Sequence, residues 1–369
     1  MAEPIPIYQG NDFYVPQYEV RLQGKPVGKD VVRDVQQVTY KDNIEEIDSF
    51  EIQINNWDAA KLDLKYSDDT LFDPGKKLEV WMGYFGRDHM RRMISGEITS
   101  LRPTFPASGP PTLAISGLNL LHRLRTKQES HAYEEKKDSQ IAREIAGRLE
   151  IDIETDAAAE AEEEVYEYLF QDNQYDILFL IQRARRIGYD LFVTEDESGS
   201  KLSFKPTVNL RQVAYTLEYG RSMIQFQPNL TTANQVSECT VRGWDPKTKK
   251  KFEYTAKRSE LSTKGVGSEG GQEVIEQSFK QRKEVVADRP ISSEQEAKTL
   301  AIETLERIAK DMVKGTGSTV GLPDLRAGGV LFIEGLGKRF SGRYFVTSTT
   351  HTIGDSGYTT QFECRREEV

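Results

Sequence analysis

Two β-rich segments, one near each end of the chain, show the same succession of turn and strand signals. In the first, Phe72-Asp73-Pro74-Gly75 leads into LEVWMGYFG, then ISGEITS and TLAISG. In the second, Leu325-Arg326-Ala327-Gly328 leads into VLFIEGLG, then FSGRY, VTSTTH and TTQFEC. A repeated order of this kind predicts two similar β units in one chain. The spacing differs by one residue in the first strand and the shared residues are mostly glycine and serine, so a chance likeness of two β-meanders stays open.

Short alternating apolar runs fill the first 120 residues. They are YEVRL, SFEIQINNW, KLEVWMGYF, RMISGEITSL and PTLAISGL. This period-2 pattern is typical of strands with one buried face. Turn-forming residues at 73–75 and 106–111 provide the tight connections. Residues 1–124 are therefore predicted to form an all-β unit.

Helical signals begin after Leu124. Asp138 or Ser139 is placed to cap a helix that carries Ile141, Ile145 and Leu149 on one face. A second amphipathic helix is predicted over 173–188, with Gly188 as its stop. Its apolar stripe consists of Ile177, Leu178, Ile181, Ala184 and Ile187. The strand-like runs YDLFVT and KLSFKP follow, so residues 125–230 are predicted to be a mixed α/β insertion.

The segment 156–164 is rich in alanine and glutamate and shows no apolar stripe. Both a helix and a solvated linker fit this composition, and a linker or a loosely held helix is favoured because no apolar stripe requires burial.

Strand patterns return after residue 237, in ECTVRGW and KFEYTA and later in GVLFIEGLG, GRYFVTSTTHTI and YTTQFECRR. Between them, at about 262–320, lie a polar glycine-rich loop and a long helix. Ser293 and Glu296 are spaced as a capping box, and Gly315 is expected to end the helix. The predicted buried stripe is Ala297, Leu300, Ala301, Leu305, Ile308 and Met312. Residues 231–369 are thus predicted to be a second β unit interrupted by this loop and helix, and the whole chain to be α+β and β-rich.

Composition limits the classes of partner. The net charge of −10 disfavours a nucleic-acid partner, because such proteins gain affinity from phosphate contacts. The one basic cluster, at 247–251, is interpreted as a solvated hairpin tip. No apolar run approaches the length of a membrane span and the first residues lack a signal peptide, so we expect cytoplasmic synthesis and no membrane anchor. Cys239 and Cys364 are predicted to be buried thiols.

Motifs for chemistry are few. The chain has four histidines and lacks HExxH, GxSxG and GxxxxGK[ST]. A GxGxxG match at 265–270 follows the polar run SELSTK instead of a strand, so it is interpreted as a loop. His351 stands beside a turn, where a structural hydrogen bond is expected in preference to a ligand or base role. The 59 carboxylates leave open a hydrolytic pair within 124–226, formed without any sequence signature.

Six segments together resemble the hub family of contractile tails, which includes phage late control protein D and VgrG-like proteins. The similarity covers nearly the whole chain and is nearest to hubs of extracellular contractile injection systems. The segments are 34–58, 72–84, 94–124, 138–149, 171–193 and 322–366. Each is weak alone, and their common order makes the assignment specific.

The resemblance implies two tube-protein-like β-barrel domains per chain and a homotrimer around a channel. Three chains would present six similar units to a hexameric tail tube protein and threefold symmetry to a trimeric spike protein. Other baseplate proteins are further implied partners, and assembly into a baseplate is the implied destination. Because the chain ends at Val369, directly after the second β unit, the spike is expected to be a separate chain. The acidic balance predicts a channel wall that does not retain nucleic acid or acidic cargo.

No catalytic residue, cofactor or metal is expected, so the protein is not predicted to be an enzyme. The alternatives are a tail-associated peptidoglycan hydrolase and a glycan-binding module. The residues that carry the hub resemblance at turns and strands are Pro74, Gly75, Gly83, Gly96, Gly117, Gly328, Gly335, Gly342, Tyr344, His351 and Gly357.

Overall fold

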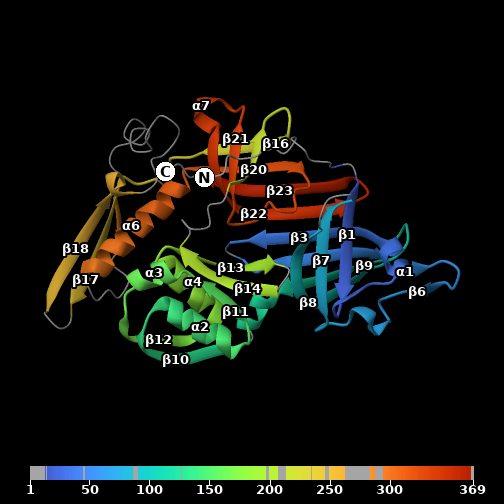
Figure 1. Ribbon diagram of the computed structural model, residues 1–369, viewed down its shortest axis with the longest axis horizontal. Helices are drawn as coiled ribbons and strands as arrows, with labels where there is room; N and C mark the ends of the chain where they lie inside the picture. Colours follow the sequence, from blue (N-terminus) through green and yellow to red (C-terminus); the bar gives the residue numbers. More distant parts are fainter. Residues whose placement is uncertain are drawn as a thin grey trace.

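The computed structural model describes most of the chain, and the architecture is α+β and β-rich, as the sequence predicted (Figure 1). The described residues are 13, 15–44, 46–85, 90–125, 127–196, 199–206, 213–233, 235–245, 249–261, 283–286 and 294–366. The glycine-rich loop, the GxGxxG match and the Ser293 capping box lie outside them.

One sheet of 13 strands runs through the described part of the chain and joins its two ends. Its main path is β16-β20-β23-β22-β3-β4-β9-β8-β7-β1-β2, and β21 pairs with both β22 and β15. The strands from the first half are β1 (Pro16–Leu22), β2 (Lys25–Pro26), β3 (Val35–Asn43), β4 (Ser49–Asn55), β7 (Lys77–Tyr84), β8 (Arg91–Thr104) and β9 (Thr112–Asn119). Those from the second half are β15 (Val213–Glu218), β16 (Met223–Leu230), β20 (Val313–Val320), β21 (Val330–Glu334), β22 (Gly342–Gly354) and β23 (Gly357–Arg366).

All five strands predicted in the first unit are confirmed. β4 and β9 alternate strictly between buried and partly exposed residues, which puts Ile52, Ile54 and Ile115 into one core. The short elements around this unit are α1 (Lys29–Asp34), β5 (Trp57–Asp58), β6 (Asp63–Leu64), η1 (Thr70–Phe72) and η2 (Leu120–Arg125). The sequence analysis missed β3, because its run VQQVTYKDN is mostly polar.

A second core lies under the C-terminal strands, around Leu331, Tyr344 and Phe362. The sequence placed residues 213–230 with the middle insertion, whereas the structure pairs β15 with β21 and β16 with β20 in the large sheet. The short helix α7 (Gly337–Phe340) follows β21.

The middle of the chain forms a separate mixed structure with its own core. It comprises β10 (Gln128–Lys136), α2 (Asp138–Arg148), β11 (Asp152–Thr155), α3 (Ala157–Glu162), β12 (Tyr166–Tyr175), α4 (Asp176–Arg186), β13 (Tyr189–Asp196) and β14 (Gly199–Pro206). Both predicted amphipathic helices are present. Within 156–164 the structure has the short helix α3, which buries no residue, so the loosely held helix is the alternative that is confirmed; Asp156 caps it by accepting hydrogen bonds from Ala158 N and Ala159 N.

Two details of these helices differ from the sequence prediction. Asp138 is the first residue of α2 and does not cap it, because its carboxylate is buried against Arg183, at 2.5 Å from Nε and 2.9 Å from Nη2. Leu178 was assigned to the buried stripe of α4 but is exposed, and Phe179 and Leu180 are buried in its place.

Residues 235–310 add a further small core beside the large sheet. There β17 (Glu238–Asp245), β18 (Lys250–Lys257) and β19 (Lys283–Val286) form a sheet that packs on α6 (Glu294–Lys310), with η4 (Arg258–Glu260) nearby. Asp245 pairs with Lys250 in the antiparallel β17 to β18 ladder, so the described part of the basic cluster, residues 249–251, lies at the start of the second strand of a hairpin, in agreement with the prediction. Gly315 does not end α6. It lies within β20, where the Phe226 ring occupies the space that a side chain would need.

Both cysteines are confirmed as buried free thiols. Cys239 belongs to the small core of α6 and Cys364 to the core under the C-terminal strands.

Gly117 in β9 is expected to tolerate no side chain. A Cβ atom there would lie 2.3 Å from Glu97 O and 2.3 Å from Phe50 Cζ, so Gly117→Ala should lower the free energy of unfolding by about 1–3 kcal/mol. Urea unfolding measures the change. The matched control is Gly147→Ala in α2, where no atom lies within 4 Å and alanine should stabilise the helix by up to about 1 kcal/mol. Equal stability of Gly117→Ala and wild type would contradict the close packing.

Candidate assembly interface at the junction of the two β units

The two β units repeat one strand topology. In chain order, the six strands of the first are β1, β3, β4, β7, β8 and β9, and those of the second are β15, β16, β20, β21, β22 and β23. In each set the first strand pairs with the fourth, the fourth with the fifth, the fifth with the sixth, the sixth with the third and the third with the second. Only the first pairing differs in direction, since β1 and β7 are antiparallel and β15 and β21 parallel.

The repeat extends to single residues, in the turns before β7 and β21 and within β8 and β22. Gly75 N donates to Ile98 O at 2.8 Å, and Gly328 N donates to Val346 O at 2.9 Å. Both glycines have positive φ, +89° and +86°, which explains their place in these turns. One residue further along, the β8 to β9 ladder shifts between Ile98 and Ser100, and the β22 to β23 ladder shifts between Val346 and Ser348.

A second register shift also lies at equivalent positions in the two units. The β3 to β4 ladder shifts between Val35 and Gln37, and the β16 to β20 ladder shifts between Met223 and Gln225. Chance likeness of two meanders does not produce matching pairings and matching bulges, so the structure favours the repeat interpretation.

The units are joined edge to edge by β22 and β3. The ladder runs from Ser348 opposite Asn43 to Gly354 opposite Gln37, and Ile44 N extends it by donating to Thr347 O at 3.0 Å. Figure 1 shows the result, with the C-terminal strands β20, β23 and β22 lying beside β3 from the first unit.

Asp42 is the central polar residue of this junction. One carboxylate oxygen accepts hydrogen bonds from the main-chain N (3.1 Å) and the hydroxyl of Thr349, and the other accepts from Ala327 N at 3.1 Å. Arg326 Nη1 lies 3.8 Å from the same carboxylate. Burial raises the pKa of Asp42, and the Arg326 charge opposes that rise. The carboxylate thus ties the first β unit to two segments of the second.

Arg326 also reaches back into the first unit. Its Nη2 donates to Arg92 O at 3.1 Å and Met93 O at 2.9 Å, and its guanidinium stacks over the Tyr40 ring at 4.7 Å. At the same edge, the Tyr84 hydroxyl donates to Gly321 O at 2.9 Å. These polar contacts link the two β units beside the β3 to β22 ladder.

His351 is fully buried within β22, opposite Tyr40. Its Nδ1 lies 2.9 Å from the Tyr358 hydroxyl and 3.1 Å from Thr360 Oγ1, and its Nε2 lies 3.0 Å from Leu325 O. Burial, with the nearby Arg326 charge, lowers the pKa of His351 to about 3. The imidazole is therefore neutral at physiological pH and acts as a hydrogen-bonding group within the junction.

The other sequence-selected residues lie in turns and strands away from this cluster. Pro74, Gly75 and Gly328 precede β7 and β21, and Gly335 follows β21. Those within strands are Gly83 (β7), Gly96 (β8), Gly117 (β9), Gly342 and Tyr344 (β22) and Gly357 (β23). Sequence reasoning missed Asp42, although a signal existed, because Val38, Tyr40 and Asp42 are the alternate, buried positions of β3.

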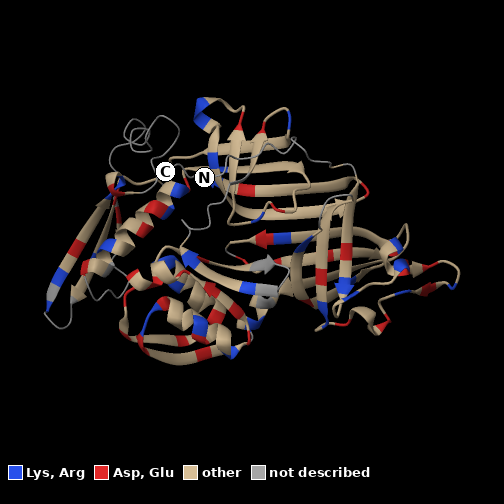
Figure 2. Cartoon of the chain, viewed as in Figure 1, with Lys and Arg blue, Asp and Glu red and all other residues tan. Residues whose placement is uncertain are grey.

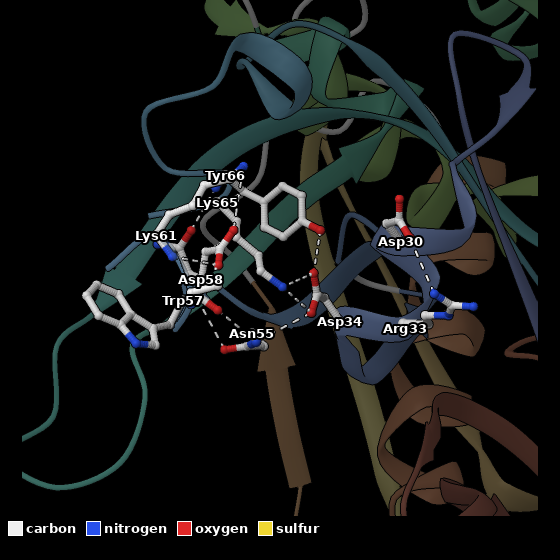
Figure 3. A network of polar contacts seen from close by, with 11 residues as sticks. Asp30, Arg33, Asp34, Asn55, Trp57, Asp58, Lys61, Lys65 and Tyr66 are labelled. Carbon is white, nitrogen blue, oxygen red and sulfur yellow. Dashed lines mark hydrogen bonds and ion pairs between the residues drawn. The ribbon is translucent and has the colours of Figure 1, made fainter. Parts of the chain in front are cut away.

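A polar network lies at another part of the first unit, between α1 and the β5 to β6 segment (Figure 3). Asp34 accepts from Lys65 Nζ at 2.9 Å and from the Tyr66 hydroxyl at 2.6 Å. Burial opposes ionisation of Asp34, but the hydrogen bonds from Tyr66, Lys65 and Asn55 outweigh it and lower its pKa. Burial, with Asp34 nearby, raises the pKa of Tyr66, so this phenol is a hydrogen-bond donor and the network is structural.

Several described carboxylates of the middle structure are held in ion pairs. Asp138 is held by Arg183, Glu160 by Arg143, and Asp176 lies 3.2 Å from Arg148. Glu303 on α6 differs, because burial, with repulsion from Glu306, raises its pKa to about 7. Its carboxylate packs against Gly188.

Within the described residues, no three His, Cys, Asp or Glu side chains are grouped to hold a metal ion. Nor does any described helix have the length and apolar character needed to cross a membrane. In the view of Figure 2, acidic and basic residues are interspersed along the strands and helices.

Comparisons with solved structures place this fold among tail proteins. A 43 kDa tail protein of prophage MuSo2 from Shewanella oneidensis superposes with a TM-score of 0.72 at 12% identity, covering 95% of this chain and 98% of that one. A tail protein from Neisseria meningitidis MC58 gives 0.67 at 13% identity, covering 96% and 97%.

The third similar structure is E. coli c3393, described as a component of the type VI secretion system with structural similarity to the T4 bacteriophage tail proteins gp27 and gp5. Its TM-score is 0.60 at 10% identity, covering 95% of this chain and 79% of that one. Identities this low establish the fold alone. A search of curated proteins found no match.

A family model, described as the Alg8 N-terminal domain, matches residues 14–355 and so takes in both β units and everything between them. The sequence match thus spans the junction, and the chain belongs to the Alg8 N-terminal domain family.

Proposed function

We propose that the protein is a structural hub of a phage-like contractile tail or injection system, a homotrimer that adapts a hexameric tail tube to a trimeric spike. The observation that carries the proposal is the repeat of one six-strand topology in two units joined edge to edge. Three such chains contain six similar units, so one assembly can match a sixfold partner on one side and a threefold partner on the other.

The similar tail proteins support this role, since their chains share the fold over nearly their whole length. The E. coli neighbour, with its stated likeness to the tail proteins gp27 and gp5, supports a place in a tail-like assembly. We further propose that other baseplate proteins are its partners and that it is assembled into a baseplate. Among contractile particles, we propose an extracellular contractile injection system as the one that contains it.

The domain organisation is part of the proposal. We propose a first tube-like domain up to about residue 124, a mixed insertion after it, and a second tube-like domain that includes β15 and β16. The pairing of β16 with β20 and of β15 with β21 supports this position of the second domain's start. The glycines and prolines of the matching turns would then specify the two tube-like folds, with His351 and Tyr344 in the core of the second.

No enzymatic role is proposed. The ion-paired carboxylates of the middle structure fit a structural role, because a hydrolytic pair needs one carboxyl group free to donate a proton and one free to accept it. Release of soluble fragments from peptidoglycan, abolished by a single Asp or Glu substitution in residues 124–226, would favour the hydrolase instead.

Mass measurement in solution tests the hub. The chain alone should have three times its monomer mass of 42.0 kDa, or, if trimerisation needs the trimeric spike encoded beside it, the complex should have that mass plus the mass of the spike. Light scattering coupled to gel filtration gives this value, and the spike alone is the control. A monomer in both samples would contradict the proposed trimer.

A further inference from the structure

The outer edge of β16 lacks the partner that its counterpart has. β16 is the last strand on the path of the large sheet and, among the described residues, pairs only with β20. Its counterpart in the first unit, β3, pairs with β4 on one edge and with β22 on the other. An exposed sheet edge offers main-chain hydrogen-bonding groups to another strand.

The second half of β8 also has one strand edge without a ladder partner in the described structure. Up to Ile98, β8 is flanked by β9 and by the β7 segment, whereas residues 99–104 have β9 as their one ladder partner in the described structure. The corresponding part of β22, residues 347–353, pairs with β3. Strands β13 and β14 approach β8, yet Ser100, Arg102 and Thr104 stay exposed.

We propose that β16 of one copy of the chain pairs with residues 99–102 of β8 in the next copy, reproducing between chains the β3 to β22 junction within each chain. This inference rests on the proposed trimer and names the surface that forms it. The partner is a second copy because the vacant edges are the two halves of a junction that this chain already forms internally.

The matching bulges fix the register. Ser348 faces Asn43 and Thr349 faces Asp42 in the internal junction. Transferring these pairs through the equivalent ladders places Ser100 opposite Thr231, Leu101 opposite Leu230 and Arg102 opposite Asn229. The intermolecular junction therefore substitutes a leucine pair for the buried pair of Asp42 and Thr349.

Leu101 and Leu230 fit this position. Each is partly buried against the core of its own unit, Leu101 in the first and Leu230 in the second, and each keeps an exposed remainder for a neighbour to cover. Two apolar side chains facing each other across a ladder stabilise the pair.

Two prolines limit the ladder. The same register places Pro103 opposite Pro228, where neither residue has an N–H to donate. The hydrogen-bonded part is thus expected to end after Arg102 and Asn229. Prolines on exposed edges also discourage pairing in other registers while the chain is monomeric.

The geometry of the contact leads to a closed ring. β16 and β8 are different surfaces, so the contact is heterologous and each copy offers one edge to each neighbour. Three copies would alternate three internal and three intermolecular junctions around the ring. Six similar β units would then follow one another in a single circle.

Cysteine cross-linking tests the register. In the Arg102→Cys/Asn229→Cys variant, both substituted residues are exposed and lie on different chains in the proposed pair. Mild oxidation of this variant with its spike should give a covalent species of three chains, because paired strands bring Cα atoms within disulfide range. The control Thr104→Cys/Asn229→Cys is out of register by two residues and should cross-link at least tenfold more slowly.

Two results separate failure of this inference from failure of the proposed function. A trimer by mass without the covalent species, or equal cross-linking by the control, would overturn the β16 to β8 contact and leave the trimer standing. A monomer by mass would overturn both. Hydrogen exchange of the wild-type chain gives an independent reading, since the amides of Leu101 and Leu230 should be protected in the assembly and exchange at the rate of open edges if the contact is absent.

Discussion

Replacing Asp42 by alanine is expected to lower the free energy of unfolding by about 3–5 kcal/mol, the usual cost of removing one partner from a buried charged cluster. The substitution leaves the amide of Thr349, the hydroxyl of Thr349 and the amide of Ala327 without their acceptor. It also removes the carboxylate beside Arg326. All of these groups lie at the junction, so the loss should separate the two β units before either one unfolds.

Denaturant unfolding measures this effect, with a lowered slope expected if the units no longer unfold together. The matched control is Asp30→Ala, an exposed carboxylate of α1 whose Arg33 partner lies 3.5 Å away and is also exposed. A pair of this kind contributes about 0–1 kcal/mol. Similar losses in both variants would show that the junction does not depend on Asp42.

Lowering the pH is expected to destabilise the protein through His351. The pKa of this imidazole is about 3 in the folded chain and about 6.5 when unfolded. Between these values the unfolded state binds a proton that the folded state does not, so this contribution to stability is complete above pH 6.5 and decreases as the pH falls towards 3. At about 1.4 kcal/mol per pH unit, the loss between pH 7 and 4.5 is about 3 kcal/mol.

The His351→Gln variant should lose that part of the pH dependence, although its stability at pH 7 will also be lower. Tyr358→Phe is the matched control, because it removes one hydrogen bond to His351 and retains the imidazole. Its free energy of unfolding should be lower than that of the wild type at every pH, but should change with pH as steeply as in the wild type. Burial raises the pKa of Asp42 and of Asp48, which acts in the opposite direction, but both carboxylates are present in all three proteins. If the free energy of unfolding of His351→Gln depended on pH as steeply as that of the wild type, His351 would not be the buried neutral group described here.

Local patterns in the sequence were sufficient to predict five of the six longer strands of the first unit and both middle helices. Alternation such as that of β4 is a property of a few neighbouring residues, and the positive φ of Gly75 and Gly328 is a local requirement of their turns. For the same reason the misjudged details, Asp138 and Gly315, are residues whose roles depend on distant partners, Arg183 and Phe226. The order of strand signals also indicated the repeat of the two β units.

Only the tertiary structure decided which strand edges meet. Main-chain hydrogen bonds are nearly the same for every residue, so a sequence does not specify that β3 pairs with β22 or that β16 joins the large sheet. Those choices depend on packing between segments about 300 residues apart, such as Asp42 with Thr349. The sequence by itself thus determined two similar β units and their turns, and the tertiary structure determined the edge that joins them, because edge pairing is selected by long-range packing and not by local propensity.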